Sequence, residues 1–214
     1  MKGAIFDMDG LLFDTERLFQ RVWHEMAAER GLTLDGGFAL AVCGTTGAAE
    51  EAVVRRYFPG AEPAAIIEEL NRRTRALEQT EVPLKPGVRT ILKGMREDGW
   101  RIAVASSSAE DMVVRNLRVA GIDGYFDAVV SGTQVPHGKP APDIFLLAAQ
   151  RLGLPASDCW VFEDSVNGVR AGIAAGCKTV MVPDLVPPLP EFYAQCAGVW
   201  PDLAAAWEQI AANV

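Results

Sequence analysis

The sequence predicts an α/β protein whose core is a doubly wound, mainly parallel sheet and which carries an inserted all-helical domain. Five short apolar runs are continuous rather than alternating, as expected of parallel strands that are covered on both faces. Most of these runs are separated by stretches with helical periodicity, which favours a Rossmann-like succession of strands and helices. The interval after the first run is long, helical in pattern and without a strand signal.

The predicted strands cover residues 4–8, 101–106, 127–132, 159–164 and 178–183. Helices are predicted between them, with starts after glycine, proline or serine and two ends at Gly121 and Gly153. Within residues 15–81 there are three helical stretches, at 18–26, 52–57 and 66–77. We therefore expect a helical domain at 15–81, inserted into an α/β domain formed by 1–14 and 82–214.

Composition narrows the class of partner. The 214 residues carry a net charge of -8 and have a pI near 4.8, which argues against nucleic acid or an anionic membrane as partner. There is no C-x-x-C pair and no apolar run of about 18 residues, and we expect no signal peptide because the first ten residues have one basic residue before the acids. We expect a cytoplasmic monomer, without a membrane partner, whose four cysteines are reduced core thiols.

The first predicted strand ends in the sequence Asp7, Met8, Asp9 and Gly10. Two carboxylates about 4 Å apart at an effective dielectric near 20 repel by roughly 4 kcal/mol, so a pair placed here needs compensation. In an extended backbone, positions i and i+2 point the same way, so both carboxylates can enter one pocket while Met8 turns into the core. Gly10 permits a turn and a close backbone approach. Taken alone, the pair could equally be two solvated loop aspartates.

Polar residues also follow the other predicted strands, and the carboxyl ends of strands are where open α/β sheets bind ligands. Glu163 and Asp164 end the fourth strand, although Asp164 or Ser165 could simply cap the next helix. Four acids at one edge need a cation, and an all-oxygen ligand set favours Mg²⁺. His24 and His137 are far apart in sequence and are expected at the surface, which disfavours zinc.

Hydroxyls and one ammonium complete this edge. Ser106 and Ser107 can bind a phosphate together with the backbone N–H groups of the following helix, whereas Ser108 is interpreted as a cap paired with Asp111. Lys139, held between a glycine and a proline, can neutralise a phosphoryl group.

The order of these motifs resembles a known family. DMDG, a strand-terminal serine, a lysine before proline and ED before a helix are similar to the four motifs of the haloacid dehalogenase-like phosphohydrolases. The insertion resembles the small helical cap of the subfamily that contains β-phosphoglucomutase and sugar phosphatases. FDMDGLLFDTERLF, HGKPAPDIFLLAAQR and FEDSVNGVRAGIAAGCKTVMVPD are also similar to pseudouridine-5'-phosphatase-like members. The resemblance implies a Mg²⁺-dependent phosphatase acting on a small phosphorylated metabolite, a sugar phosphate or nucleotide-like molecule.

The resemblance also implies residue roles. Asp7 would attack phosphorus and form an aspartyl-phosphate, and Asp9 would protonate the leaving alcohol and then activate water. Mg²⁺ would be held by Asp7, the Asp9 main-chain carbonyl and Asp164, with Glu163 as a further ligand or as a support behind them. The phosphoryl oxygens would be bound by Ser106, Ser107 and Lys139.

Three alternatives remain open. A β-phosphoglucomutase would match Thr15, but this chain has Phe19 where a histidine is expected and Cys43 and Gly47 where cap cations are expected. A receiver-type signalling protein would take its acidic pair and phospho-acceptor from different strands and would have no helical cap. An inert binding protein would not need the full set of chemical residues.

Substrate choice is expected to depend on the cap. The candidate residues are Thr15, Glu16, Gly44 and Thr45. The GTTG segment could supply backbone donors there, and it could equally be an ordinary helix-start loop.

Overall fold

A computed structural model describes residues 2–42, 45, 47–184 and 187–212. Contacts within the chain divide it into two compact units, one formed by Met1–Asp14 and Leu84–Val214, the other by Thr15–Pro83. The first is an α/β unit and the second is a helical unit, and each is described by itself.

The described part of the α/β unit contains one six-stranded sheet, and its neighbouring strands are parallel. The spatial order is β3-β2-β1-β4-β5-β6. The strands are β1 (Gly3–Phe6), β2 (Arg101–Ser106), β3 (Ala128–Ser131), β4 (Cys159–Glu163), β5 (Lys178–Met181) and β6 (Gly198–Val199). The predicted fold class is confirmed, and all five predicted strands are present. The sixth has two residues, too few to produce an apolar run.

Parallel pairing places the carboxyl ends of the central strands side by side. Phe6, the last residue of β1, is in register with Val104 on one side and Phe162 on the other. All four residues of β1 are buried, which accounts for the continuous apolar pattern. Alternate residues face opposite sides of the sheet, so Ile5 joins the cluster formed with α7, while the Phe6 ring stacks on Phe162 with centroids 4.6 Å apart.

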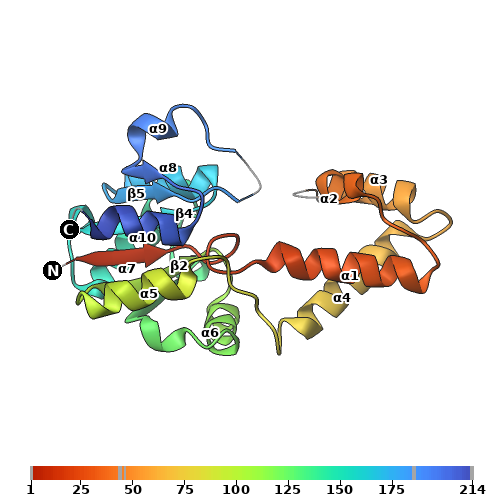
Figure 1. The fold of residues 1–214 in the computed structure, drawn as a ribbon, viewed down its shortest axis with the longest axis horizontal. Helices are drawn as coiled ribbons and strands as arrows, with labels where there is room; N and C mark the ends of the chain where they lie inside the picture. The colour runs from red at the N-terminus through yellow and green to blue at the C-terminus, as the bar shows by residue number, and fades with distance from the viewer. Residues whose placement is uncertain (1, 43–44, 46, 185–186, 213–214) are drawn as a thin grey trace. The chain divides into compact units, whose positions relative to one another are not determined.

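Helices cover this sheet (Figure 1). They are α5 (Val88–Glu97), α6 (Glu110–Val119), α7 (Asp143–Leu152), α8 (Val166–Ala174), α9 (Phe192–Gln195) and α10 (Leu203–Ala211). Residues of α7 and α8 share a hydrophobic cluster with β1 to β4, whereas α5 packs against α10 and β2. The predicted ends at Gly121 and Gly153 are confirmed, since both glycines adopt positive φ just after a helix.

Among its described residues the helical unit has four helices, one more than the three predicted stretches: α1 (Thr15–Glu29), α2 (Gly36–Val42), α3 (Ala48–Tyr57) and α4 (Pro63–Leu77). The prediction missed α2 because its seven residues span only two turns. Trp23 of α1 packs on Phe38 of α2 and Phe58 beyond α3, so aromatic rings tie these helices together.

The expectation of core thiols is only partly met, because Cys159 is buried but Cys177 and Cys196 are half-buried. Cys159, Cys177 and Cys196 are free thiols, while Cys43 lies outside the described residues. Among the described helices, none has both the length and the apolar character needed to span a membrane.

Candidate active site

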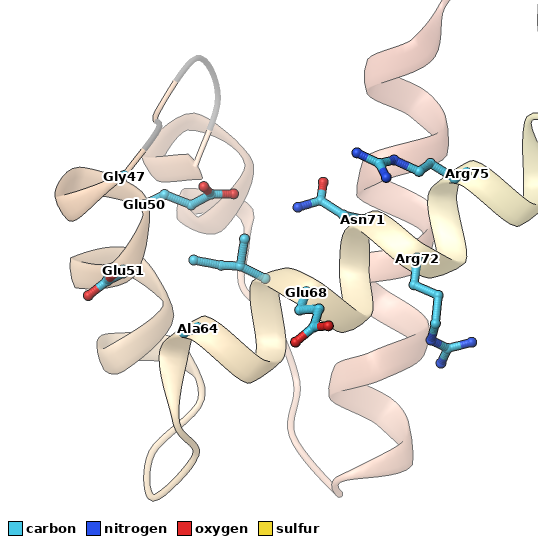
Figure 2. Close-up of a pocket in the computed structure, with 9 residues that line it drawn as sticks. Gly47, Glu50, Glu51, Ala64, Glu68, Asn71, Arg72 and Arg75 are labelled. Carbon is cyan, nitrogen blue, oxygen red and sulfur yellow. The ribbon is translucent and has the colours of Figure 1, made fainter.

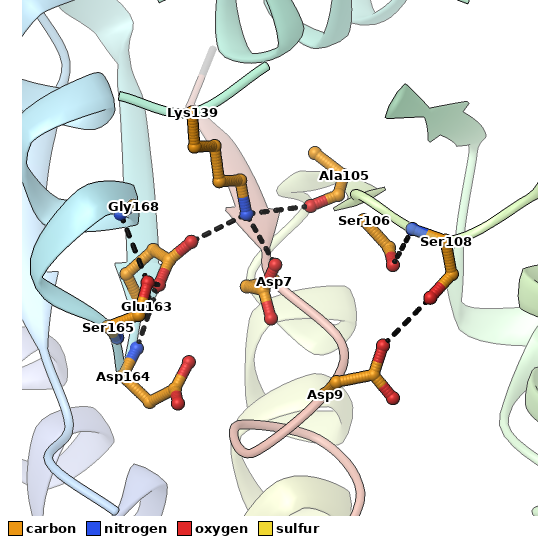
Figure 3. A network of polar contacts seen from close by, with 10 residues as sticks. All are labelled: Asp7, Asp9, Ala105, Ser106, Ser108, Lys139, Glu163, Asp164, Ser165 and Gly168. Atoms are coloured by element: carbon orange, nitrogen blue, oxygen red, sulfur yellow. Dashed lines mark hydrogen bonds and ion pairs between the residues drawn. The ribbon is translucent and has the colours of Figure 1, made fainter. Parts of the chain in front are cut away.

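The predicted polar residues of the α/β unit meet at the carboxyl edge of the sheet (Figure 3). Asp7 follows β1 directly and continues its pairing, because its N–H donates to the Phe162 carbonyl at 3.0 Å. Asp7 is 8% exposed, and Met8 is fully buried, as the i, i+2 argument predicted. Ser106 ends β2, and Glu163 ends β4. Residues distant in sequence therefore share one small volume.

Lys139 lies at the centre of this volume. Its Nζ donates to the Asp7 carboxylate, to Glu163 Oε1 at 2.5 Å and to the Ala105 carbonyl at 3.3 Å. Burial by itself would lower the pKa of Lys139, but Asp7 and Glu163 outweigh that effect and hold this pKa above its ordinary value. Lys139 is therefore a charged ammonium with a fixed position.

Glu163 is fully buried, and both of its oxygens have donors. Oε1 accepts from Lys139, while Oε2 accepts from the N–H of Asp164 at 3.1 Å and from the N–H and hydroxyl of Ser165, both at 3.0 Å. A buried carboxylate requires this degree of pairing. Of the two roles expected for Glu163, its contacts favour support of the surrounding groups over direct ligation.

Helix α8 begins directly behind Glu163. The Ser165 hydroxyl accepts from the Gly168 N–H at 3.0 Å, so Ser165 is the cap and Asp164 is left free of that role. Gly168 packs against Glu163 so closely that a β-carbon there would overlap the carboxylate. The sequence did not single out this glycine, because the close approach arises only when the strand and the helix are both in place.

Three carboxylates can hold a cation. Asp7, Glu163 and Asp164 each offer an oxygen, and these oxygens lie within 4.8 Å of one another. Burial and the Glu163 carboxylate raise the pKa of Asp7 well above its ordinary value, and the same two causes raise the pKa of Asp164 to about 7. Negative charge is therefore in excess here, and a hard divalent cation with oxygen ligands fits the donor set.

Asp9 lies beside this cluster, and its partner is Ser108. The Ser108 hydroxyl donates to Asp9 Oδ2 at 3.0 Å. The interpretation of Ser108 as a helix cap is wrong, because α6 begins at Glu110, and its N-cap, Ala109, has no side-chain hydrogen bond. One residue, Ala109, thus separates Ser108 from the helix, and the Ser108 hydroxyl is not used as a cap. Desolvation raises the pKa of Asp9, and the Ser108 hydrogen bond partly opposes this shift.

The other two serines differ in their surroundings. Ser106 is 1% exposed, and its Oγ accepts from the Ser108 N–H at 3.0 Å, so its hydroxyl proton remains available to a ligand. Ser107 is exposed. Both serines therefore stay candidates for binding an anion.

A second group of charges, which the sequence analysis missed, borders the cluster. Lys85 Nζ lies 2.5 Å from Asp184 Oδ1 and 3.4 Å from Asp14 Oδ1. Gly10 has φ of 83° and packs against Asp164, with Asp184 nearby, so it makes the predicted turn, and its approach to a ligand stays a prediction. The signal for Lys85 and Asp184 was weak, because 99 positions separate them.

Within the helical unit, the structure places the predicted cap residues on two segments. Thr15 opens α1, and Glu16 accepts a 2.6 Å hydrogen bond from Gln20. Thr45 donates to the Val42 carbonyl at 2.7 Å, and Gly44 lies outside the described residues. Glu16 and Thr45 line one cavity of about 160 Å³ together with Glu50.

A larger cavity of about 660 Å³ lies between α3 and α4 (Figure 2). Glu50 also lines this cavity, opposite Asn71 and Arg75 of α4. Burial raises the pKa of Glu50 above its ordinary value. The sequence analysis did not single out these residues, since they read as the polar face of ordinary helices.

The predicted surface positions of the two histidines are confirmed. His24 and His137 are exposed, and His137 Nδ1 lies 2.9 Å from Asp143 Oδ1. Neither residue belongs to the acidic cluster.

Comparison with known proteins identifies the family. The model of the haloacid dehalogenase-like hydrolases matches residues 1–176. The chain belongs to this family. The prediction made from its four motifs is thereby confirmed.

Relatives within the haloacid dehalogenase-like family support a phosphatase. Fructose-1-phosphate phosphatase YqaB of Escherichia coli is 36% identical over 183 residues, covering 84% of this chain and 95% of the relative. A probable pseudouridine-5'-phosphatase of Drosophila melanogaster is 38% identical over 192 residues, covering 85% and 81%. A family hydrolase from Deinococcus radiodurans, solved with bound phosphate and sodium, superposes with a TM-score of 0.80 at 31% identity, covering 99% and 96%. The predicted activity, hydrolysis of a phosphoric monoester, is confirmed at the level of the enzyme class.

Proposed function

We propose that this protein is a Mg²⁺-dependent phosphatase that hydrolyses a small phosphomonoester through an aspartyl-phosphate at Asp7. The observation that carries the proposal is the position of Lys139, whose ammonium contacts both Asp7 and Glu163 beside an acidic cluster suited to a cation. This arrangement supplies a nucleophile, a fixed positive charge and a cation site within one hydrogen-bonded group.

In the first step, an Asp7 oxygen attacks phosphorus and the bond from phosphorus to the leaving oxygen breaks. Asp9 donates its proton to that leaving oxygen, so the product departs as a neutral alcohol. Lys139 and the Ser106 hydroxyl stabilise the charge that develops on the phosphoryl oxygens.

In the second step, water attacks the aspartyl-phosphate. Asp9, now ionised, takes a proton from the water, and the bond between phosphorus and the Asp7 oxygen breaks. Inorganic phosphate leaves, Asp7 is again a carboxylate, and Asp9 is again protonated. Both aspartates thus return to their starting states.

The cation would be held by Asp7, Asp164 and the main-chain carbonyl of Asp9. When bound, Mg²⁺ supplies positive charge that screens the phosphoryl oxygens from the carboxylates. Glu163 holds Lys139 and the start of α8 in place behind these ligands.

The substrate class in this proposal is a phosphorylated sugar or nucleoside. It is supported by the names of two relatives, a fructose-1-phosphate phosphatase and a probable pseudouridine-5'-phosphatase. Thr15, Glu16 and Thr45 remain the candidates for contacting the group beyond the phosphate, and Gly44 stays with them as a sequence-based candidate. A monomeric, cytoplasmic enzyme is also part of the proposal, and size-exclusion chromatography tests the first of these two properties.

The mutase alternative would place a histidine near position 19, at the start of the helical unit. Phe19 occupies that position and packs against the hydrophobic cluster of the unit, so it offers no imidazole there. The expectation that this protein is a phosphatase rather than a mutase therefore depends on the side chain at position 19.

The test is release of inorganic phosphate from p-nitrophenyl phosphate and from a panel of sugar and nucleoside monophosphates, with Mg²⁺ or with EDTA. We expect metal-dependent release by the wild-type protein, loss of release in Asp7→Asn, and acid-stable label on Asp7 after a rapid quench with radiolabelled substrate. Asp98→Asn, at an exposed position after α5, is the matched control. Full activity in Asp7→Asn would refute the assignment of the nucleophile.

A further inference from the structure

The hydroxyl of Ser108 contacts the proposed acid and base, Asp9, and this contact has a definite polarity. The Ser108 Oγ lies 3.0 Å from Asp9 Oδ2. An ionised carboxylate only accepts hydrogen bonds, so the serine must donate its single hydroxyl proton there. When Asp9 is protonated, the same bond keeps Oδ2 as the carbonyl oxygen. The exchangeable proton then belongs on Oδ1.

The main chain of Ser108 is held on both sides. Its N–H donates to Ser106 Oγ at 3.0 Å, and its carbonyl accepts from Ser131 Oγ at 2.6 Å. Ser131 is the last residue of β3, is paired in register with Ser106, and is fully buried. The end of β3 thus contacts directly the loop after β2 that carries Ser107 and Ser108, which we call the serine loop.

The hydroxyl of Ser131 has no freedom to turn elsewhere. Its one proton goes to the Ser108 carbonyl, so the contact of 3.0 Å with Thr133 Oγ1 must be donated by the threonine. The Thr133 N–H donates to the same Ser131 oxygen at 3.2 Å. With two donors and one acceptor around it, this buried hydroxyl is fully paired and fixed in direction.

Packing gives a second constraint from the same strand end. A β-carbon on Gly132 would lie 2.9 Å from the Ser107 carbonyl oxygen and 3.0 Å from its α-carbon. The backbone of β3 therefore closes on the serine loop at a distance that only glycine allows. Hydrogen bonding and steric contact both hold the loop in the conformation that directs Ser108 toward Asp9.

We propose that Ser108 orients the carboxyl group of Asp9 for proton transfer to the leaving group, and that Ser131 is a positioning residue that holds Ser108 for this task. The inference rests on the proposed phosphatase function and deepens it. It makes the end of β3, a strand that carries none of the residues of the four motifs, part of the machinery that protonates the leaving alcohol.

The experiment compares phenyl phosphates that match in size and differ in the basicity of the leaving phenol. p-Nitrophenol leaves readily without a proton, whereas p-methoxyphenol depends on a general acid. In Ser108→Ala and Ser131→Ala we expect kcat/KM for p-methoxyphenyl phosphate to fall about 10-fold or more, and kcat/KM for p-nitrophenyl phosphate to change less than about 3-fold. A purely structural role would lower both values together, and that result would overturn the proposal.

Two variants serve as matched controls. Ser108→Thr keeps the hydroxyl at a half-buried position, so we expect it to retain the wild-type ratio between the two substrates. Thr133→Val removes one donor to Ser131 but leaves the Ser131 bond to Ser108, so we expect the ratio to be retained here as well. If Ser108→Thr changes the ratio of the two kcat/KM values as much as Ser108→Ala does, the hydroxyl of residue 108 is not what orients Asp9, and the proposal is contradicted.

Other outcomes separate this inference from the proposed function. If the wild-type protein releases no phosphate from either phenyl ester or from the panel, the phosphatase proposal itself fails. If the wild type is active and the ratio in Ser108→Ala equals the wild-type ratio, only the present inference fails. If Ser131→Ala does not fold, the comparison of Ser108→Ala with Ser108→Thr still decides whether Asp9 depends on the hydroxyl.

Discussion

Gly168→Ala reverses the usual expectation for a glycine inside a helix. Gly168 lies in α8 with a negative φ, and replacing such a glycine with alanine ordinarily stabilises a protein by about 0.5–1 kcal/mol. Here the added β-carbon would overlap the buried Glu163 carboxylate. The carboxylate must move, because the helix backbone and the strand are fixed by their own hydrogen bonds. We therefore expect destabilisation.

The size of the effect follows from what Glu163 would lose. Displacement breaks its ion pair with Lys139 and its bonds from the Asp164 N–H and from Ser165. Breaking a buried ion pair costs about 3–5 kcal/mol. After subtracting the helix-propensity gain, we expect a net loss of about 2–4 kcal/mol in the free energy of unfolding. For a chain of this length that corresponds to roughly 5–15 °C in melting temperature.

Urea unfolding and thermal melting measure this loss, and phosphate release measures its effect on Lys139. Gly36→Ala is the matched control, because Gly36 opens α2 with no atom within 4 Å of the added β-carbon. We expect Gly36→Ala to melt at the wild-type temperature or slightly above it. A Gly168→Ala protein that is as stable as wild type would refute the steric argument.

Three further outcomes follow from the same cluster. Lys139→Met should lower phosphate release by at least about 10²-fold, since the ammonium that contacts Asp7 and Glu163 is removed, whereas the exposed Lys93→Met should have no effect. The raised pKa of Asp164, about 7, means that the folded, metal-free protein keeps a proton that the unfolded chain has released, so its stability falls as pH rises from about 4 to about 7. Mg²⁺ should therefore raise the melting temperature more at about pH 8 than at about pH 5.5. The reverse order would contradict the assignment of Asp164 as a ligand of the cation. Lys85→Met should release Asp184 as an additional negative charge near the cluster and tighten Mn²⁺ binding measured by electron paramagnetic resonance.

Much of the α/β unit was predictable from the sequence because its strands are buried on both faces. Burial on both faces makes each strand a continuous apolar run, and parallel pairing then places all their carboxyl ends at one edge. That is why Asp7, Lys139 and Asp164 could be grouped before any coordinate was known. The short elements β6 and α2 were not predicted, because two and seven residues carry too little periodic signal.

The parts of the site that the sequence did not predict depend on distances between residues in the folded chain rather than on residue type. Ser108 has the residue type and spacing of a helix cap, and only the start of α6 at Glu110 shows that its hydroxyl is free to reach Asp9. Ser131 and Gly168 are ordinary strand and helix residues until the neighbouring loop packs against them. A pattern in one sequence cannot reveal a contact that tertiary packing creates.

The two aspartates of DMDG differ because their surroundings differ. Asp7 is buried beside an ammonium and two further carboxylates. Burial and the Glu163 carboxylate raise its pKa, so Asp7 would act as an anion when a bound cation offsets its charge. Asp9 lies two residues on and receives a hydrogen bond from the neutral Ser108 hydroxyl, while desolvation raises its pKa. A carboxyl with a raised pKa and no ion pair is suited to carry and return a proton. The roughly 4 kcal/mol repulsion expected for such a pair is therefore met in two ways, by countercharge at Asp7 and by a bias toward protonation at Asp9.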